Sequence, residues 1–96
     1  MRGLAVSIVM AAVTATAADA EFGRYLSSEC ATCHGAAKTD STIPVLQGLD
    51  EKHLIEVLNA YRARTLPNPV MQTIASRLRD EEIEALAAYY ATLKPK

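Results

Sequence analysis

The clearest pattern of hydrophobic and polar positions is helical and lies in the second half of the chain. Between residues 51 and 63, hydrophobic side chains recur at intervals of three and four, which predicts an amphipathic helix. A second such pattern begins near Asp80, where acidic residues fill the first turn, and ends at Pro95. The buried stripes are expected at Leu54, Ile55, Val57, Leu58 and Tyr61 in the first helix, and at Ile83, Leu86, Ala87 and Tyr90 in the last.

Two shorter helices are predicted over residues 22–30 and 70–78. Asp50 and Asp80 stand where the N-caps of the two longer helices are expected. Residues 34–49 are predicted to be irregular because they contain Gly35, Asp40, Ser41, Pro44 and Gly48. Residues 65–69 are predicted to form a loop, because two prolines two positions apart do not fit inside a helix. No alternating strand pattern occurs, so we expect an all-α fold in one domain. The buried sides of the short helices are expected to carry Phe22, Tyr25, Leu26 and Glu29 in one, and Met71, Ile74, Ala75 and Leu78 in the other.

The first twenty residues have the layout of a secretory signal peptide. Arg2 precedes an apolar run from residue 4 to residue 13, and a small-x-small site ends at Ala20. The run is about half the ~20 residues that a membrane-spanning helix needs, which argues against the alternative of a membrane anchor. We therefore expect cleavage before Glu21, with cleavage after Ala17 as the alternative. The mature domain would be residues 21–96, working in the periplasm with no permanent membrane span.

Composition then excludes some functions and limits the core. Ten Lys and Arg stand against eleven Asp and Glu, a net charge of −1, which excludes a strongly basic nucleic-acid binder. Half of the residues are hydrophobic, but many of them lie in the first twenty, and the chain has no Trp and only one Phe. A short mature chain with so thin a core usually needs a disulfide, a metal or a cofactor.

The two cysteines indicate which cofactor this is. The run Cys30-Ala31-Thr32-Cys33-His34 has the spacing of a c-type haem attachment site, in which each thiol bonds one vinyl group and the histidine ligates iron. A disulfide at this spacing would close a very small loop and stabilise little. A thioredoxin-like redox pair would need a βαβ pattern, and a zinc site would have only these three side chains and His53 as ligands. We therefore expect one covalent haem c.

The second axial ligand of the iron is predicted by elimination. Outside the signal segment, Met71 is the only methionine and His53 the only histidine besides His34. Met71 follows a proline-rich loop that could cross the open haem face, whereas His53 lies in a charged first turn of a helix and is expected at the surface. A site with the ligands His34 and Met71 leaves no iron position for oxygen or peroxide. It favours outer-sphere electron transfer over catalysis, so we do not expect an enzyme.

The mature chain resembles a class I cytochrome c, a fold of about four helices wrapped around one covalent haem. Within that class it is similar both to the single haem domains of periplasmic dihaem carriers and to the haem subunit of flavocytochrome c sulfide dehydrogenase. The resemblance is carried by the haem motif with Gly35, Ile43-Pro44-x-Leu46-x-Gly48, Tyr61-x-x-Arg64, Met71-x-x-Ile74-Ala75-x-x-Leu78, and the run from Asp80 to Tyr90.

The resemblance also implies roles for individual residues. The carbonyl of Pro44 would accept the N–H of the proximal imidazole, and Tyr61 and Arg64 would hold the haem propionates. The terminal helices would cross closely, with Ala87 and Ala88 allowing the approach. Tyr89 and Tyr90 are expected to pack in and around the core rather than to carry electrons.

Three functions remain open from the sequence. The chain could be the haem subunit that accepts electrons from a sulfide-oxidising flavoprotein, or a free soluble shuttle between respiratory complexes. The third is a haem enzyme or gas sensor in which Met71 is labile. The partner is in each of the first two cases another redox protein.

Overall fold

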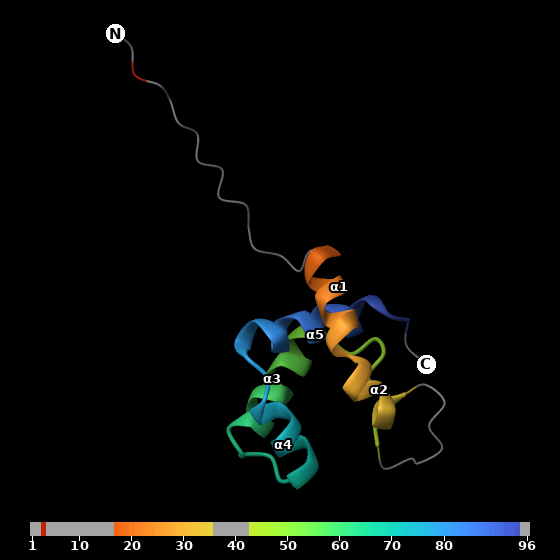
Figure 1. The fold of residues 1–96 in the computed structure, drawn as a ribbon, viewed down its shortest axis with the longest axis vertical. Coiled ribbons are helices and arrows are strands. Elements are labelled where there is room, and N and C mark those ends of the chain that lie inside the picture. Colours follow the sequence, from red (N-terminus) through yellow and green to blue (C-terminus); the bar gives the residue numbers. More distant parts are fainter. Residues whose placement is uncertain (1–2, 4–16, 36–42, 95–96) are drawn as a thin grey trace.

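Most of the residues that the structure describes lie in helices. The computed structural model of the 96-residue chain describes residue 3, residues 17–35 and residues 43–94. These ranges contain five helices and no strand, so the all-α prediction is confirmed (Figure 1). The helices are α1 (Ala17–Leu26), α2 (Ser28–His34), α3 (Glu51–Arg62), α4 (Pro69–Ser76) and α5 (Asp80–Thr92).

The predicted signal segment lies mostly outside the described residues. Its last four residues form the first turn of α1, so the expected cleavage point after Ala20 falls within this helix. Among the helices of the described ranges, none has both the length and the apolar character needed to cross a membrane.

The two longer helices begin close to their predicted starts, but they are capped differently. Asp50 caps α3 as predicted, with its carboxylate accepting the backbone N–H of His53 at 3.0 Å. The prediction that Asp80 caps α5 is wrong. The N-cap is Arg79, whose backbone N–H donates to the Glu82 carboxylate at 2.8 Å, and this hydrogen bond lowers the pKa of Glu82.

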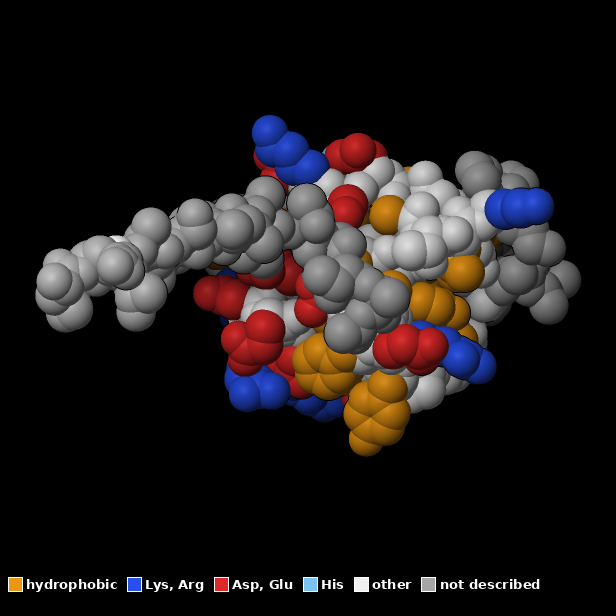
Figure 2. Space-filling model, turned by 90° about the horizontal axis from the view of Figure 1, so that it is seen from above, with side chains coloured by type: hydrophobic (Ala, Val, Ile, Leu, Met, Phe, Trp, Pro, Cys, Tyr) orange, Lys and Arg blue, Asp and Glu red, His pale blue; other side chains and the backbone are white. Residues whose placement is uncertain are grey.

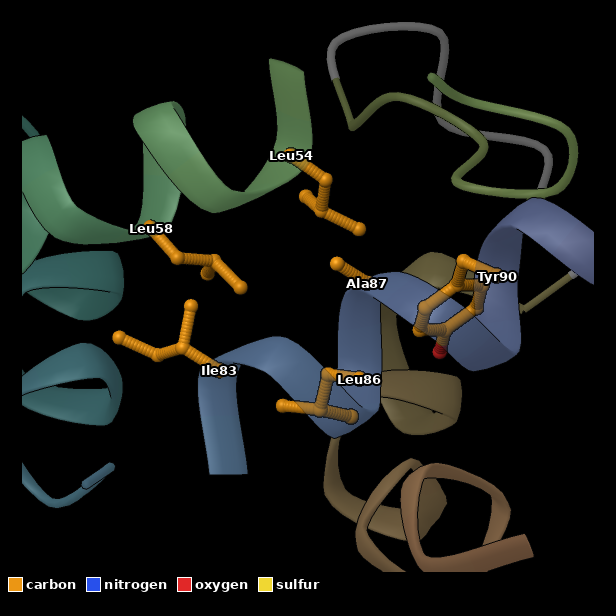
Figure 3. Close-up of a cluster of buried hydrophobic side chains, with 6 residues drawn as sticks. All are labelled: Leu54, Leu58, Ile83, Leu86, Ala87 and Tyr90. Carbon is orange, nitrogen blue, oxygen red and sulfur yellow. The ribbon is translucent and has the colours of Figure 1, made fainter. Parts of the chain in front are cut away.

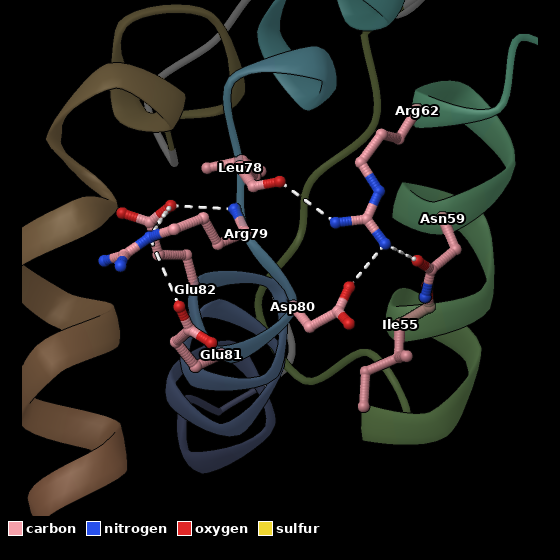
Figure 4. Close-up of polar contacts among 8 residues, drawn as sticks. All are labelled: Ile55, Asn59, Arg62, Leu78, Arg79, Asp80, Glu81 and Glu82. Carbon is pink, nitrogen blue, oxygen red and sulfur yellow. Dashed lines mark hydrogen bonds and ion pairs between the residues drawn. The ribbon is translucent and has the colours of Figure 1, made fainter.

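The Asp80 carboxylate is engaged by another element instead. The guanidinium of Arg62, at the end of α3, donates to Asp80 at 2.6 Å, to the side chain of Asn59 at 2.7 Å and to the carbonyl of Leu78 at 3.0 Å (Figure 4). Arg62 therefore ties the end of α3 to the start of α5, a role that sequence patterning did not identify.

The predicted first helix is in fact two helices. A break at Ser27 separates α1 from α2, and the Ser27 hydroxyl donates to the carbonyl of Arg24 at 2.7 Å. Of the residues expected on its buried side, Leu26 packs against the core, but Phe22 is 38% exposed and Tyr25 is 77% exposed. Gly23 and Ser27 are buried instead. On the face shown in Figure 2, hydrophobic side chains reach the surface between acidic and basic ones.

The buried glycine explains which face of α1 turns inward. α5 lies across α1, and a Cβ on Gly23 would overlap the carbonyl oxygen of Ala85 and stand 2.7 Å from the Cβ of Tyr89 (Figure 1). The terminal helices thus cross closely, as the resemblance implied. However, the atoms nearest to Gly23 belong to Ala85 and Tyr89, rather than to the predicted Ala87 and Ala88. Only a residue without a side chain fits at this crossing.

The hydrophobic core lies between α3 and α5. The predicted stripe of α5 is confirmed, and two of the expected α3 residues, Leu54 and Leu58, are buried against it. Tyr90 lies at one end of the cluster, and Leu58 and Ile83 lie at the other (Figure 3). The buried cluster consists of Leu54, Leu58, Ile83, Leu86, Ala87 and Tyr90.

Candidate functional site

The short helix α2 carries the two cysteines and His34. Cys30 is partly buried against the hydrophobic cluster, whereas Cys33 is exposed, and both are free thiols. Burial raises the pKa of the Cys30 thiol, as does the nearby charge of Glu29. The chain leaves α2 at Gly35, where an added Cβ would stand 2.7 Å from the carbonyl oxygen of Ala31. α2 therefore presents two different thiols, one against the core and one open to solvent.

The imidazole of His34 is oriented by the loop that follows. Its Nδ1 lies 2.7 Å from the carbonyl oxygen of Pro44. A carbonyl only accepts hydrogen bonds, so Nδ1 must carry the hydrogen and donate it. In the neutral ring, Nε2 is then left with a free lone pair. A histidine held in this way is prepared to bind a metal through Nε2.

The Pro44 carbonyl is held in place by contacts of its loop with the core. Leu46 and Leu49 pack against the hydrophobic cluster. Between them, Gly48 has a φ of 79°, a left-handed conformation that favours glycine, and its N–H donates to the carbonyl of Tyr90 at 2.9 Å. The end of α5 thus anchors the segment that orients His34.

Met71 lies in the first turn of α4 and is positioned by its cap. Pro69 is the first residue of the helix, and the side-chain oxygen of Asn68 accepts the N–H of Met71 at 3.0 Å. Met71 is partly buried and packs against the same hydrophobic cluster as Cys30. α4 also meets α2 through an ion pair of 3.9 Å between Arg77 and Glu29.

The Asn68 cap gives a first testable prediction. Asn68→Ala is expected to lower the free energy of unfolding by about 1 kcal/mol, because the N–H of Met71 loses its acceptor. Asn68→Ser is the matched control, since serine retains a capping oxygen and should stay close to wild type. Urea titration of both variants measures the effect. Equal stability of Asn68→Ala and wild type would contradict the assigned cap.

Tyr61 and Arg64, the two predicted propionate ligands, lie near the end of α3. Tyr61 is half-buried. Arg64 is exposed, and its guanidinium donates to the side chain of Gln72 on α4 at 2.9 Å. Its φ of 64° is in the left-handed region, where a side chain costs about 1–2 kcal/mol. Arg64 therefore contacts α4 at Gln72, the residue that follows Met71, but its charge faces solvent.

The alternative chemistries find little support in the described residues. His53 is exposed in the first turn of α3, as expected. Within residues 17–35 and 43–94, no three His, Cys, Asp or Glu side chains lie close enough together to hold a metal ion, so a zinc site is not supported there. Cys30 and Met71 pack against the same hydrophobic cluster, and the short helix α2 that carries Cys30 also carries Cys33 and His34. This set of groups fits a haem bound through both thiols and ligated on both sides of its iron.

Comparison with known proteins agrees with this chemistry. The sequence model of the family described as cytochrome c matches residues 20–94. The chain belongs to the cytochrome c family. The cofactor of this family is covalent haem c, and Cys30 and Cys33 fit its attachment motif. The protein is thus an electron-transfer haem protein.

Curated relatives of this cytochrome fall into two groups. It is 38% identical over 74 residues to cytochrome c-553 of Helicobacter pylori (strain J99), covering 74% of this chain and 77% of the relative. It is also 42% identical over 62 residues to the thiosulfate dehydrogenase electron acceptor of Stutzerimonas stutzeri (strain A1501). A protein of the same name from Thiomonas intermedia (strain K12) is 35% identical over 72 residues.

The two electron acceptors are much longer than the matched region. The alignments cover 62% and 72% of this cytochrome, but only 29% of the Stutzerimonas protein and 33% of the Thiomonas protein. This cytochrome therefore corresponds to about a third of each of these relatives.

Proposed function

We propose that this cytochrome is a mono-haem electron carrier that acts in the periplasm after removal of residues 1–20. In this proposal Cys30 and Cys33 hold the haem covalently, and His34 and Met71 bind its iron. The observation that carries the proposal is the 2.7 Å contact between His34 Nδ1 and the Pro44 carbonyl, which leaves Nε2 available for iron.

The haem, when bound, supplies a one-electron ferric–ferrous couple. The residues of this chain hold the two proposed iron ligands in place. His34 is fixed by Pro44, and Met71 is fixed by its cap and by its contact with the core, so neither ligand is expected to leave easily. If His34 and Met71 both bind the iron, they would exclude exogenous ligands, and electron transfer would need no bond to be made or broken. A thioether ligand also raises the potential relative to a second histidine.

Tyr61 and Arg64 are proposed to hold the propionates. A buried carboxylate needs a cation or a hydrogen-bond donor, and both residues lie on the segment that leads into α4. The guanidinium of Arg64 is exposed and its printed partner is the neutral side chain of Gln72, so it could exchange this partner for a propionate at little cost.

The proposed electron donor is a dehydrogenase that oxidises an inorganic sulfur compound. The names of the Stutzerimonas and Thiomonas relatives support thiosulfate dehydrogenase as one such donor. The resemblance to the haem subunit of flavocytochrome c supports a sulfide-oxidising flavoprotein as the other. In either case the sulfur compound would react on the partner, and this cytochrome would only take the electrons away.

The exposed side of α4 is the surface proposed to meet this partner. It carries an open hollow, and Val70 in it is 63% exposed. An exposed apolar surface of this kind excludes water when a partner docks on it. The hollow is lined by Pro69, Val70, Thr73, Ile74 and Arg77.

Rapid-mixing reduction of the purified haem-loaded protein tests this function. Catalytic amounts of a thiosulfate dehydrogenase with thiosulfate, or of a flavoprotein sulfide dehydrogenase with sulfide, should reduce it within the turnover time of the enzyme. The control omits the enzyme, because sulfide itself can reduce haem. Co-elution with a flavin-containing chain from the native source would favour a fixed subunit, and elution alone would favour a free shuttle. Failure of both enzymes to accelerate reduction would contradict the proposed donor class.

A further inference from the structure

The side chain of Gln72 joins α4 to the loop that precedes this helix. Its Nε2 donates to the backbone carbonyl of Leu66 at 2.9 Å, and its Oε1 accepts from the guanidinium of Arg64 at 2.9 Å. Gln72 is half-buried and directly follows Met71 in the chain. One side chain of α4 is thus bonded to two residues of the loop, next to the proposed iron ligand.

These two hydrogen bonds fix which way the amide of Gln72 points. A backbone carbonyl only accepts hydrogen bonds, and a guanidinium only donates them. The amide nitrogen must therefore face Leu66 and the amide oxygen must face Arg64, because the reversed amide would oppose two acceptors at one contact and two donors at the other. A carboxylate in this place would serve Arg64 but not Leu66, so a substitution can separate the two contacts.

The loop is held on its other side by α3. The carbonyl of Ala60 accepts the N–H of Thr65 at 2.9 Å, the hydroxyl of Thr65 at 3.1 Å and the N–H of Leu66 at 3.4 Å. α3 in turn contributes Leu54 and Leu58 to the hydrophobic core. Leu66 is therefore bonded to α3 through its N–H and to α4 through its carbonyl, in the loop that joins the two helices (Figure 1).

The bond to Leu66 differs in its effect from the cap of α4. The side chain of Asn68 accepts the N–H of Met71 at 3.0 Å, and the carbonyl of Asn68 accepts the N–H of Gln72 at 2.8 Å. Both of these bonds lie within residues 68–72, so they fix Met71 relative to its own helix. The bond from Gln72 to Leu66 adds a directional contact that fixes this helix relative to the end of α3.

We propose that Gln72 is a positioning residue for Met71: its amide fastens α4 to the turn after α3 and so keeps the thioether on the haem iron. The inference rests on the proposed ligation of iron by Met71. An axial ligand on a short helix leaves the iron to the extent that the helix can move away, which is a local opening of the fold. Since the Leu66 bond holds α4 in the closed form, its loss should shift this equilibrium about fivefold toward the open form.

Titration of ferric, haem-loaded Gln72→Ala with imidazole tests the proposal, because imidazole binds the iron where Met71 has left it. The apparent affinity for imidazole scales with the open fraction, so it should rise about fivefold over wild type. Gln72→Glu should show a similar rise, since a carboxylate accepts from Arg64 but cannot donate to Leu66.

Ser76→Ala is the matched control for both variants. Ser76 lies on the same helix, and its hydroxyl donates to the carbonyl of Thr73 at 2.6 Å, a bond that stays within α4. Its loss should leave the affinity for imidazole at the wild-type value.

Two results would overturn the proposal. If Gln72→Ala unfolds at a lower urea concentration but binds imidazole with wild-type affinity, Gln72 only stabilises the fold and does not position Met71. If the affinity rises in Gln72→Ala but not in Gln72→Glu, the effect belongs to Arg64 and not to the bond with Leu66. The near-infrared band of Met–iron ligation is recorded first in the wild type. Its absence would remove the ligation on which the inference rests, so a failure of the proposed function is distinguished from a failure of the role of Gln72.

Discussion

Replacing Met71 with leucine is expected to remove the weak near-infrared band of Met–iron ligation and to lower the reduction potential. Axial ligands and their surroundings shift haem potentials over roughly 0.8 V, and loss of a thioether ligand should account for about 0.1 V or more of this. Because leucine and methionine have similar volumes, the contact with the hydrophobic cluster should persist at a cost below about 1.5 kcal/mol. Absorbance spectroscopy and a potentiometric titration measure both effects.

The matched control for this change is His53→Ala. His53 is the other candidate ligand of the sequence, but it is exposed on α3 and should leave both the band and the potential unchanged. If the band is absent from the wild type or survives in Met71→Leu, or if the potential changes in His53→Ala, the assignment of the axial ligand is wrong.

Gly23→Ala is expected to destabilise the protein by about 3 kcal/mol. The added methyl group would overlap the carbonyl oxygen of Ala85, and backbone atoms of a packed helix cannot move aside as a side chain can. α1 and α5 would have to separate, and the packing of Cys30 against the hydrophobic cluster depends on α5 as well. For a domain stabilised by about 5–15 kcal/mol, this is a large loss.

At an exposed helical position the same change would have the opposite sign, since alanine favours a helix over glycine by about 1 kcal/mol. Tyr25→Ala is a suitable control, because Tyr25 lies on the exposed side of the same helix. It should leave the free energy of unfolding within about 0.5 kcal/mol of wild type. Stabilisation by Gly23→Ala in urea titration would show that the two helices do not cross at this glycine.

The longer helices were predictable because their side chains face a single hydrophobic core. Leu54, Leu58 and the stripe of α5 recur with the helical period, and Asp50 has a clear capping position. In these two helices local sequence and tertiary packing agree, so the hydrophobic pattern alone is sufficient to predict them.

The first helix departs from the hydrophobic pattern because its buried residues are Gly23 and Ser27, whereas Leu26 is only partly buried against the core. A scan for hydrophobic periodicity selects Phe22 and Tyr25, which are the exposed residues. The error at Asp80 has a similar origin. Three acidic residues follow one another at the start of α5. Glu82 accepts the backbone N–H of the N-cap residue Arg79, whereas Asp80 pairs with Arg62, which is 18 positions away. Contacts of this kind are not visible in local sequence.

Some features of the candidate site could likewise be predicted from local sequence, and others could not. The motif at residues 30–34 is local, so its haem chemistry could be read directly. The contact between His34 and Pro44 could be expected only by resemblance, since ten residues separate them. Cys30 and Met71 pack against one hydrophobic cluster from two different short helices, and no spacing in the sequence indicates this.

Addition of carbon monoxide to the reduced, haem-loaded wild-type protein tests the central claim most directly. If His34 and Met71 occupy both axial positions of a pure electron carrier, the Soret absorbance should not change at neutral pH. A rapid shift to the spectrum of a carbon monoxide complex would contradict this account and would favour a haem enzyme or gas sensor with a labile Met71.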